Sequence, residues 1–447
     1  MARDQFQTWR TPVNPTLWRE VQRVRINEPW IAPQGGAGNR RHSRGYGTSR
    51  LSAGALGKLA IVIIVLLVAA SAFQMMRPVP LPQPRATLFS AIIPGAKPSL
   101  PWLGQGSGEV DVQSVGAIAS MNPDTELPLG SVAKIITALV IVKDHPLALG
   151  SEGPTIQVSS SDVALYNTMH SQNDSVIPVA LGETLSEYQL LEALLIPSAN
   201  NFADMLANWD AGSLPAFAAK MGQLVKSLGL HHTSVTGPSG LNSHSVGSAH
   251  DQIAIAEALL KNPVLNAIVA KPQATLPGVG IVYNIDYNVG HNGFTGIETG
   301  AMSSGGNFVF AATGATGSKN MLVGAILGQI GTQPLITALN EANKLVDAAR
   351  KVPGTVTVLR AAQTVAEITS PGSNPVPVAA AHSISLIAWP GLQVTYKATF
   401  SKLSRSVASG AKVGTLEVAI GAQSQTVPLV AVGTVKGPSI AWRLTRI

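Results

Sequence analysis

The sequence predicts an α+β domain followed by a small all-β domain, both placed after an N-terminal transmembrane helix. Three observations predict this order. An apolar run covers Leu59–Met76. Helical and strand-like periodicities are mixed between residues 106 and 351, and only short strand-like runs separated by turn residues follow, from 352 to 447.

The composition indicates a chain that is folded over most of its length. Of 447 residues, 45% are hydrophobic and 12% are charged, which is too apolar for a mostly disordered protein. This length can bury at least two cores. The sequence contains no cysteine, which excludes a thiol nucleophile, disulfides and thiolate metal sites.

The positive charge is confined to the N-terminal end. Residues 1–58 carry ten basic and three acidic side chains, which accounts for the whole formal net charge of +7. The remaining residues therefore sum to zero. A folded nucleic-acid-binding domain would need a basic face, so we expect no nucleic-acid partner.

The apolar run is long enough to cross a bilayer as a helix, and we assign residues 58–76 to a membrane anchor. Basic residues crowd before it, and only Arg77 and Arg85 follow closely. The positive-inside rule then places the N-terminus in the cytoplasm and the chain after Pro78 outside, as a single-pass protein of the cell membrane. A cleaved signal peptide is the alternative, because Ala70-Ser71-Ala72 fits a cleavage site, but the long leader favours an uncleaved anchor.

Two segments flank the anchor. Residues 1–57 are basic and, from 30 onward, rich in Gly, Arg and Ser, so we expect a disordered cytoplasmic tail. Residues 77–105 contain repeated prolines, which predict a stiff extended spacer.

Residues 106–351 predict helices inserted between strands of an antiparallel sheet. We expect a strand near 110–119, a strand pair at 307–315 and 321–329 joined across Gly317-Ser318, and helices at 131–143, 185–209, 214–228, 249–260 and 335–350. The all-β domain, 352–447, should contain strands at 355–360, 383–389, 393–400, 414–420 and 426–432.

Ser131-Val132-Ala133-Lys134 opens a predicted helix, so Ser131 and Lys134 lie one turn apart on one face. A serine hydroxyl needs a base to become a nucleophile, and a buried lysine with a lowered pKa can serve as that base. Backbone N–H groups at a helix start can also stabilise an oxyanion. In isolation, a capping serine followed by a solvated lysine is the more common explanation of this spacing.

Two further motifs carry candidate site residues. Ser198 and Asn200 lie at a break in a helical pattern, where the first can relay protons and the second can bind a substrate amide, although a polar turn that caps the next helix is the simpler interpretation. Glu298-Thr299-Gly300-Ala301 belongs to a strand that could bind an extended peptide at a sheet edge, or be an ordinary strand.

Taken in this order, Ser-x-x-Lys, Ser-x-Asn and x-Thr-Gly resemble the motif set of serine penicillin-recognising enzymes. Leu127–Lys134, Gln189–Asn200 and Gly237–Leu241 are similar to the serine D-alanyl-D-alanine carboxypeptidases, the low-molecular-mass penicillin-binding proteins. The resemblance runs from about Val110 to Arg350. It implies a penicillin-binding-protein/β-lactamase-like transpeptidase fold, and the segment ending in Trp442-Arg443-Leu444 looks like that family's β-rich C-terminal domain.

By this resemblance, Ser131 would be acylated, Lys134 would be its base, and Ser198 and Asn200 would complete the second motif. Thr299 would bind the terminal carboxylate of the substrate, Glu298 and Gly300 would flank it, and the N–H groups of Ser131 and Ala301 would form the oxyanion hole. The substrate would be a peptidoglycan stem peptide that loses its terminal D-alanine, with β-lactams as further ligands. No metal or organic cofactor is implied.

The chain departs from the family at Glu298, where the family has lysine. A glutamate replaces attraction for the substrate carboxylate with repulsion. No arginine occurs between Arg85 and Arg350 to compensate. A catalytically impaired relative that binds cell-wall peptides or a partner is therefore the alternative function.

Two other classes of hydrolase fit the sequence less well. A zinc peptidase needs clustered His and acidic ligands, and His231-His232 is the only close histidine pair. The sequence has no Gly-x-Ser-x-Gly motif, as an α/β-hydrolase would need.

The charge asymmetry around the anchor predicts the orientation of the chain in the membrane. Protease added outside intact cells should digest the region after Pro78 and leave the basic tail intact. Protection of the C-terminal region under these conditions would reverse the orientation.

Overall fold

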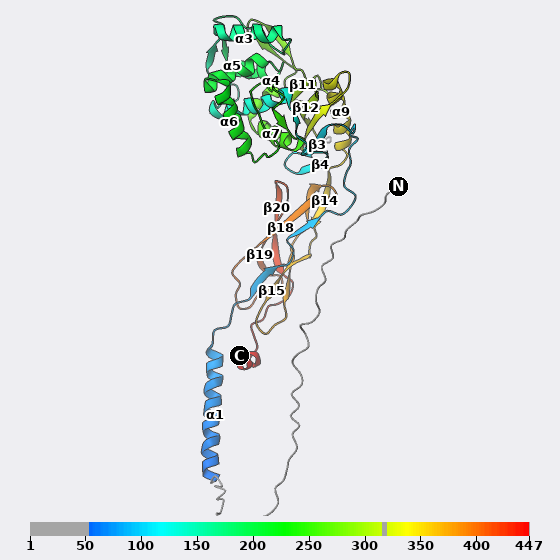
Figure 1. Ribbon diagram of the computed structural model, residues 1–447. Coiled ribbons are helices and arrows are strands. Elements are labelled where there is room, and N and C mark those ends of the chain that lie inside the picture. Colours follow the sequence, from blue (N-terminus) through cyan, green and yellow to red (C-terminus); the bar gives the residue numbers. More distant parts are fainter. Residues whose placement is uncertain (1–52, 315–319, 447) are drawn as a thin grey trace, which may run out of the picture. The chain divides into compact units, whose positions relative to one another are not determined.

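The computed structural model describes residues 53–314 and 320–446, and Figure 1 shows its elements. The chain divides into two units, with the boundary between Ala70 and Ser71. The apolar helix α1 (Ala53–Met76) carries one charged side chain, Lys58, and is long and apolar enough to cross a membrane. An anchor and a signal sequence both have these properties.

A five-stranded antiparallel sheet forms the centre of the α+β part. Its strand order is β11-β12-β13-β3-β4, so β11 is an edge strand. The strands are β11 (Phe294–Met302), β12 (Gly305–Thr313), β13 (Met321–Gln329), β3 (Ser107–Val112) and β4 (Gly116–Met121). The pairing of β12 with β13 confirms the expected strand pair, although its turn lies outside the described residues.

The two faces of the sheet pack against different helices, because side chains alternate along a strand. Val309 and Ala311 belong to the larger helical core, whereas Phe308 and Phe310 pack in the core that includes α9 (Pro334–Ala349). The larger core holds the remaining helices, which Figure 1 shows gathered on one side of the sheet. They are α2 (Lys134–Asp144), α3 (Ser160–Ser171), α4 (Glu187–Leu195), α5 (Asn200–Ala211), α6 (Leu214–Ser227), α7 (Ala249–Lys261) and α8 (Pro263–Val269).

Short strand pairs tie the loops of this part together. They are β5 (Leu127–Pro128) with β8 (Val246–Gly247), β6 (Thr155–Gln157) with β7 (Thr184–Ser186), and β9 (Gln273–Leu276) with β10 (Gly280–Tyr283). The β5–β8 pair immediately precedes the segment that carries Ser131.

The C-terminal part is a β domain, as predicted. One sheet has the order β1-β15-β16-β20-β19-β18-β2, and β14 pairs with β17. The strands are β14 (Gly354–Leu359), β15 (Thr364–Thr369), β16 (Val376–Ala380), β17 (Ile384–Ala388), β18 (Gln393–Phe400), β19 (Lys412–Ile420) and β20 (Gln423–Ala431), and a short helix, α10 (Ile440–Thr445), follows.

The segment expected to be a stiff extended spacer, 77–105, contains the two edge strands of this sheet. Strand β1 (Gln83–Ala86) pairs with β15, and β2 (Ser90–Ile92) pairs with β18. An edge strand tolerates Pro84 because one side of its backbone needs no hydrogen-bonded neighbour. The prolines therefore select an edge position here, and they do not keep the segment apart from the domain.

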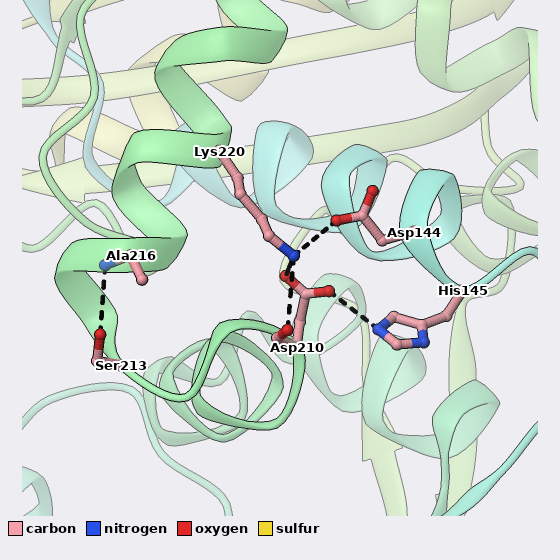
Figure 2. Close-up of polar contacts among 6 residues, drawn as sticks. All are labelled: Asp144, His145, Asp210, Ser213, Ala216 and Lys220. Carbon is pink, nitrogen blue, oxygen red and sulfur yellow. Dashed lines mark hydrogen bonds and ion pairs between the residues drawn. The ribbon is translucent and has the colours of Figure 1, made fainter.

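Helix α2 is the central helix of the larger core, because every residue from Lys134 to Val142 is buried. A polar cluster anchors its far end. Asp210, at the end of α5, accepts hydrogen bonds from Lys220 Nζ at 2.7 Å and pairs with His145 Nε2 at 2.9 Å, and Lys220 also bonds Asp144 Oδ2 at 2.8 Å. Figure 2 shows these contacts joining the ends of α2 and α5 to α6.

This cluster is structural. The serine drawn beside it in Figure 2, Ser213, caps α6 by accepting from Ala216 N. The side chain of Asp210 is 1% exposed, and a buried carboxylate with two cationic or donor partners is fixed in place. The cluster fixes the C-terminal ends of α2 and α5 relative to each other. The N-terminal ends of these two helices carry the candidate site.

Candidate functional site

Ser131 lies in a short 3₁₀ turn, η1 (Gly130–Ala133), that runs directly into α2. Gly130 makes this turn with φ +56°, and a Cβ there would lie 2.9 Å from Met302 Cγ and 3.7 Å from Ala301 N. Only glycine fits such a close approach in this backbone conformation. Ser131 itself is partly exposed, whereas Val132 and Ala133 are buried.

Lys134 is completely buried, and its amine contacts site residues just before α2 and at the start of α5. Its Nζ lies 2.8 Å from Ser131 Oγ, 3.1 Å from Ser198 Oγ, 2.9 Å from the Ser198 carbonyl and 2.7 Å from Asn200 Oδ1. The structure thus brings together the four residues that the sequence selected as catalytic.

Burial lowers the pKa of Lys134 from 10.5 to about 8, although the negative charges of Glu298, Asp204 and Asp174 oppose this change. The same contacts are open to the neutral amine. Two N–H groups can go to the two amide oxygens of Ser198 and Asn200, which are obligate acceptors, and the lone pair then faces the Ser131 hydroxyl.

Ser198 is held in the short loop between α4 and α5, with φ +57°, a left-handed conformation that is unfavourable for serine. Ala199 N donates to Ala193 O, and Asn200 N donates to Ser175 O at 2.7 Å. These bonds aim the Ser198 carbonyl and hydroxyl at Lys134. Ser198 and Asn200 are 4% and 2% exposed.

Strand β11 closes the other side of the site. A Cβ on Gly300 would lie 2.6 Å from Leu129 O, so glycine is required where the strand crosses the segment before Ser131. Glu298 and Thr299 are each 3% exposed, whereas Ala301 is exposed. The Glu298 carboxyl is therefore buried, and it lies close enough to Ser198 and Lys134 for both to lower its pKa.

The free edge of β11 carries backbone donors. Thr299 N donates to Glu298 Oε1 at 3.1 Å, so this N–H does not pair with β12. Because N–H directions alternate along a strand, the N–H of Ala301 points to the same free edge, close to Gly130. Backbone donors placed near Ser131 suit the oxyanion of an acyl-transfer reaction.

Asn307 is a positioning residue that the sequence interpretation missed. From β12, its Nδ2 donates to Pro128 O and Leu129 O, both at 2.8 Å, and its Oδ1 accepts from Gly328 N at 2.7 Å. Its side chain thus fixes the chain that leads into Ser131 to the sheet. A single amide side chain in the apolar run of β12 is the sequence signal that could have identified it.

Acidic groups surround the site. Burial raises the pKa of Asp204 to about 6 and that of Asp286 to about 7. Burial raises the pKa of Glu298 to about 8, although Lys134, Ser198 and the Thr299 N–H lower it.

Within residues 53–314 and 320–446, no group of three or more His, Cys, Asp or Glu side chains is arranged to hold a metal ion.

Comparisons with known proteins point to one family. Residues 109–329 match the family model described as D-alanyl-D-alanine carboxypeptidase, peptidase S11. The chain is 30% identical over 195 residues to a D-alanyl-D-alanine endopeptidase of Pseudomonas aeruginosa, which covers 43% of this chain and 59% of that relative. It is 27% identical over 231 residues to the D-alanyl-D-alanine carboxypeptidase DacB2 of Mycobacterium tuberculosis, covering 49% and 73%.

The first two curated relatives are matched over 59% and 63% of their own length. Among solved structures, penicillin binding protein 5 of Haemophilus influenzae is similar, with a TM-score of 0.55 at 20% identity, covering 76% of this chain and 100% of that chain. At this identity the likeness establishes the fold, an α+β penicillin-binding-protein fold with a C-terminal β domain.

Replacing Asn307 by leucine should both destabilise the protein and displace Ser131. The substitution removes the three side-chain hydrogen bonds to Pro128 O, Leu129 O and Gly328 N, which should lower the free energy of unfolding by about 2–4 kcal/mol. Thermal and denaturant unfolding measure this change. Asn340→Leu, at an exposed site on α9, is the matched control and should have little effect; equal stability of the two variants would refute the positioning role.

Proposed function

We propose, from the distant homology of residues 109–329 to D-alanyl-D-alanine carboxypeptidases and endopeptidases, that the chain is a serine-type D-alanyl-D-alanine carboxypeptidase. It removes the terminal D-alanine of peptidoglycan stem peptides through an acyl-enzyme on Ser131. The observation that carries the proposal is the buried Lys134 amine, 2.8 Å from the Ser131 hydroxyl.

In the acylation step, Ser131 Oγ attacks the carbonyl carbon of the scissile amide, and Lys134 Nζ takes the hydroxyl proton. The carbonyl oxygen becomes an oxyanion, which the N–H groups of Ser131 and Ala301 stabilise. Thr299, on the same strand, binds the terminal carboxylate of the substrate.

The tetrahedral intermediate then expels the D-alanine nitrogen, which needs a proton. Ser198 is in contact with Lys134 Nζ through its hydroxyl, at 3.1 Å, and can pass the proton from the ammonium to the leaving nitrogen. Asn200 holds Lys134 through its Oδ1 and offers its amide N–H groups to the peptide. In deacylation, a water molecule attacks the ester, with Lys134 again as the base.

A non-catalytic relative that binds cell-wall peptides or a partner is the second candidate. The negative surroundings favour it, because Glu298, Asp204 and Asp174 all stabilise the protonated form of Lys134. If the ammonium persists at neutral pH, Ser131 has no base, and the cleft only binds. Covalent labelling of the full chain by a fluorescent penicillin would exclude this second function.

Ser131→Ala should abolish release of D-alanine from a stem pentapeptide while leaving the fold intact. The partly exposed side chain of Ser131 contributes little to packing, so the free energy of unfolding should change by less than about 1 kcal/mol. D-alanine released by the detergent-solubilised full chain is the measurement, and Ser171→Ala, an exposed serine on α3, is the control.

Two results would contradict the assignment. Undiminished release by Ser131→Ala would move the nucleophile elsewhere. No release and no penicillin labelling by the parent would favour the binding function.

A further inference from the structure

The carboxyl group of Glu298 is buried beside the proton-transfer residues. Its Oε1 accepts from Thr299 N at 3.1 Å, and its Oε2 is buried without a hydrogen-bond partner among the described residues. The Ser198 hydroxyl lies beside the carboxyl and lowers its pKa, and Lys134 lies beyond Ser198. Glu298 therefore adjoins the two groups to which the proposed mechanism assigns proton transfer.

The surroundings of Glu298 disfavour a negative charge. A carboxylate with one bare buried oxygen loses its hydration without replacement. Asp286, itself 3% exposed with a bare Oδ2, adds repulsion from the loop before β11. Asp204 on α5 and Asp174 after α3 add negative charge around Lys134, which is the one cation that acts on Glu298 within the described residues.

A protonated Glu298 resolves the unpaired atom. Its carbonyl oxygen keeps the bond from Thr299 N, and the other oxygen becomes a donor. The Ser198 hydroxyl, which lies near the carboxyl and can donate to its ionised form, can accept from the protonated form. If Ser198 Oγ accepts this hydrogen bond, its own hydrogen is free for the leaving nitrogen.

We propose that Glu298 works as a neutral carboxylic acid that donates a hydrogen bond to Ser198 Oγ and so directs the Ser198 proton toward the leaving nitrogen. This inference rests on the proposed acyl transfer. As the C–N bond breaks, Ser198 gives its hydrogen to the nitrogen and regains one from the Lys134 ammonium, while Glu298 keeps its own proton. Glu298 is thus a positioning residue, and a donated hydrogen bond makes the Ser198 hydroxyl a stronger acid.

The signs of the two ionisations predict a narrow pH range of activity. Lys134 must be neutral, so activity rises as the pH increases through its pKa of about 8. Glu298 must be protonated, so activity falls as the pH increases through its pKa of about 8. Lys134 and Glu298 interact, so the two apparent pKa values of the pH profile describe the pair and not either residue alone. The profile is a bell with its maximum near pH 8.

The pH profile of penicillin acylation tests this role in the full chain. The parent should give a bell. Glu298→Gln keeps a donor N–H group without an ionisation, so it should retain the rate at the maximum and lose the alkaline limb. Glu298→Leu keeps no donor and no ionisation, so it should be about tenfold slower than Glu298→Gln at every pH, as expected for one lost hydrogen bond.

Glu341 provides a matched control. It is 1% exposed on α9, its Oε1 accepts from Leu103 N at 2.9 Å, and its Oε2 is also buried without a partner in the part of the chain that the structure describes. Burial raises its pKa as well. Glu341→Gln should keep the bell of the parent, because α9 packs on the opposite face of the sheet.

The infrared band of protonated carboxyl groups gives a readout that needs no activity. The difference between the parent and Glu298→Gln should show a protonated carboxyl at neutral pH that ionises with a midpoint of about 8. An ionised Glu298 at neutral pH, or identical pH profiles for the parent and Glu298→Gln, would overturn the proposal. Absence of acylation in every variant would refute the proposed function itself, and the infrared result then decides the protonation of Glu298 separately.

Discussion

The burial of one amine, that of Lys134, is the constraint on which the site depends. A lysine without exposed surface loses its hydration, and the loss must be offset by nearby oxygens. Those oxygens come from Ser131 at one end of α2 and from Ser198 and Asn200 at the start of α5. The two segments must therefore be held within tenths of an ångström, which only a rigid core can achieve.

The central sheet provides that rigidity, and it also supplies the third wall of the site. Strand β12 contributes apolar side chains to both cores, and the one amide side chain among them, Asn307, binds the backbone before Ser131. Edge strand β11 approaches the same backbone through Gly300. Acidic groups lie around Lys134, and Glu298 is one of them. Because the charges of Lys134 and Glu298 interact, the protonation of each depends on that of the other.

Local patterns in the sequence predicted the features that depend on local geometry. The spacing of Ser131 and Lys134 sets their contact, and the helix break at Ser198 was visible as a polar interruption. Contacts between distant segments could not be predicted in this way. Periodicity does not show that residues 83–86 pair with β15, that Asn307 reaches Leu129, or that the Glu298 side chain is buried, because each depends on tertiary packing.

Titration of Lys134 tests the central claim most directly. With ¹³C label at lysine Cε, the resonance of Lys134 is identified by its loss in Lys134→Met and followed as the pH is raised. The account predicts a midpoint of about 8, because burial outweighs the neighbouring negative charges. A midpoint at or above the ordinary value of 10.5 would contradict it, since Ser131 would then have no base at neutral pH.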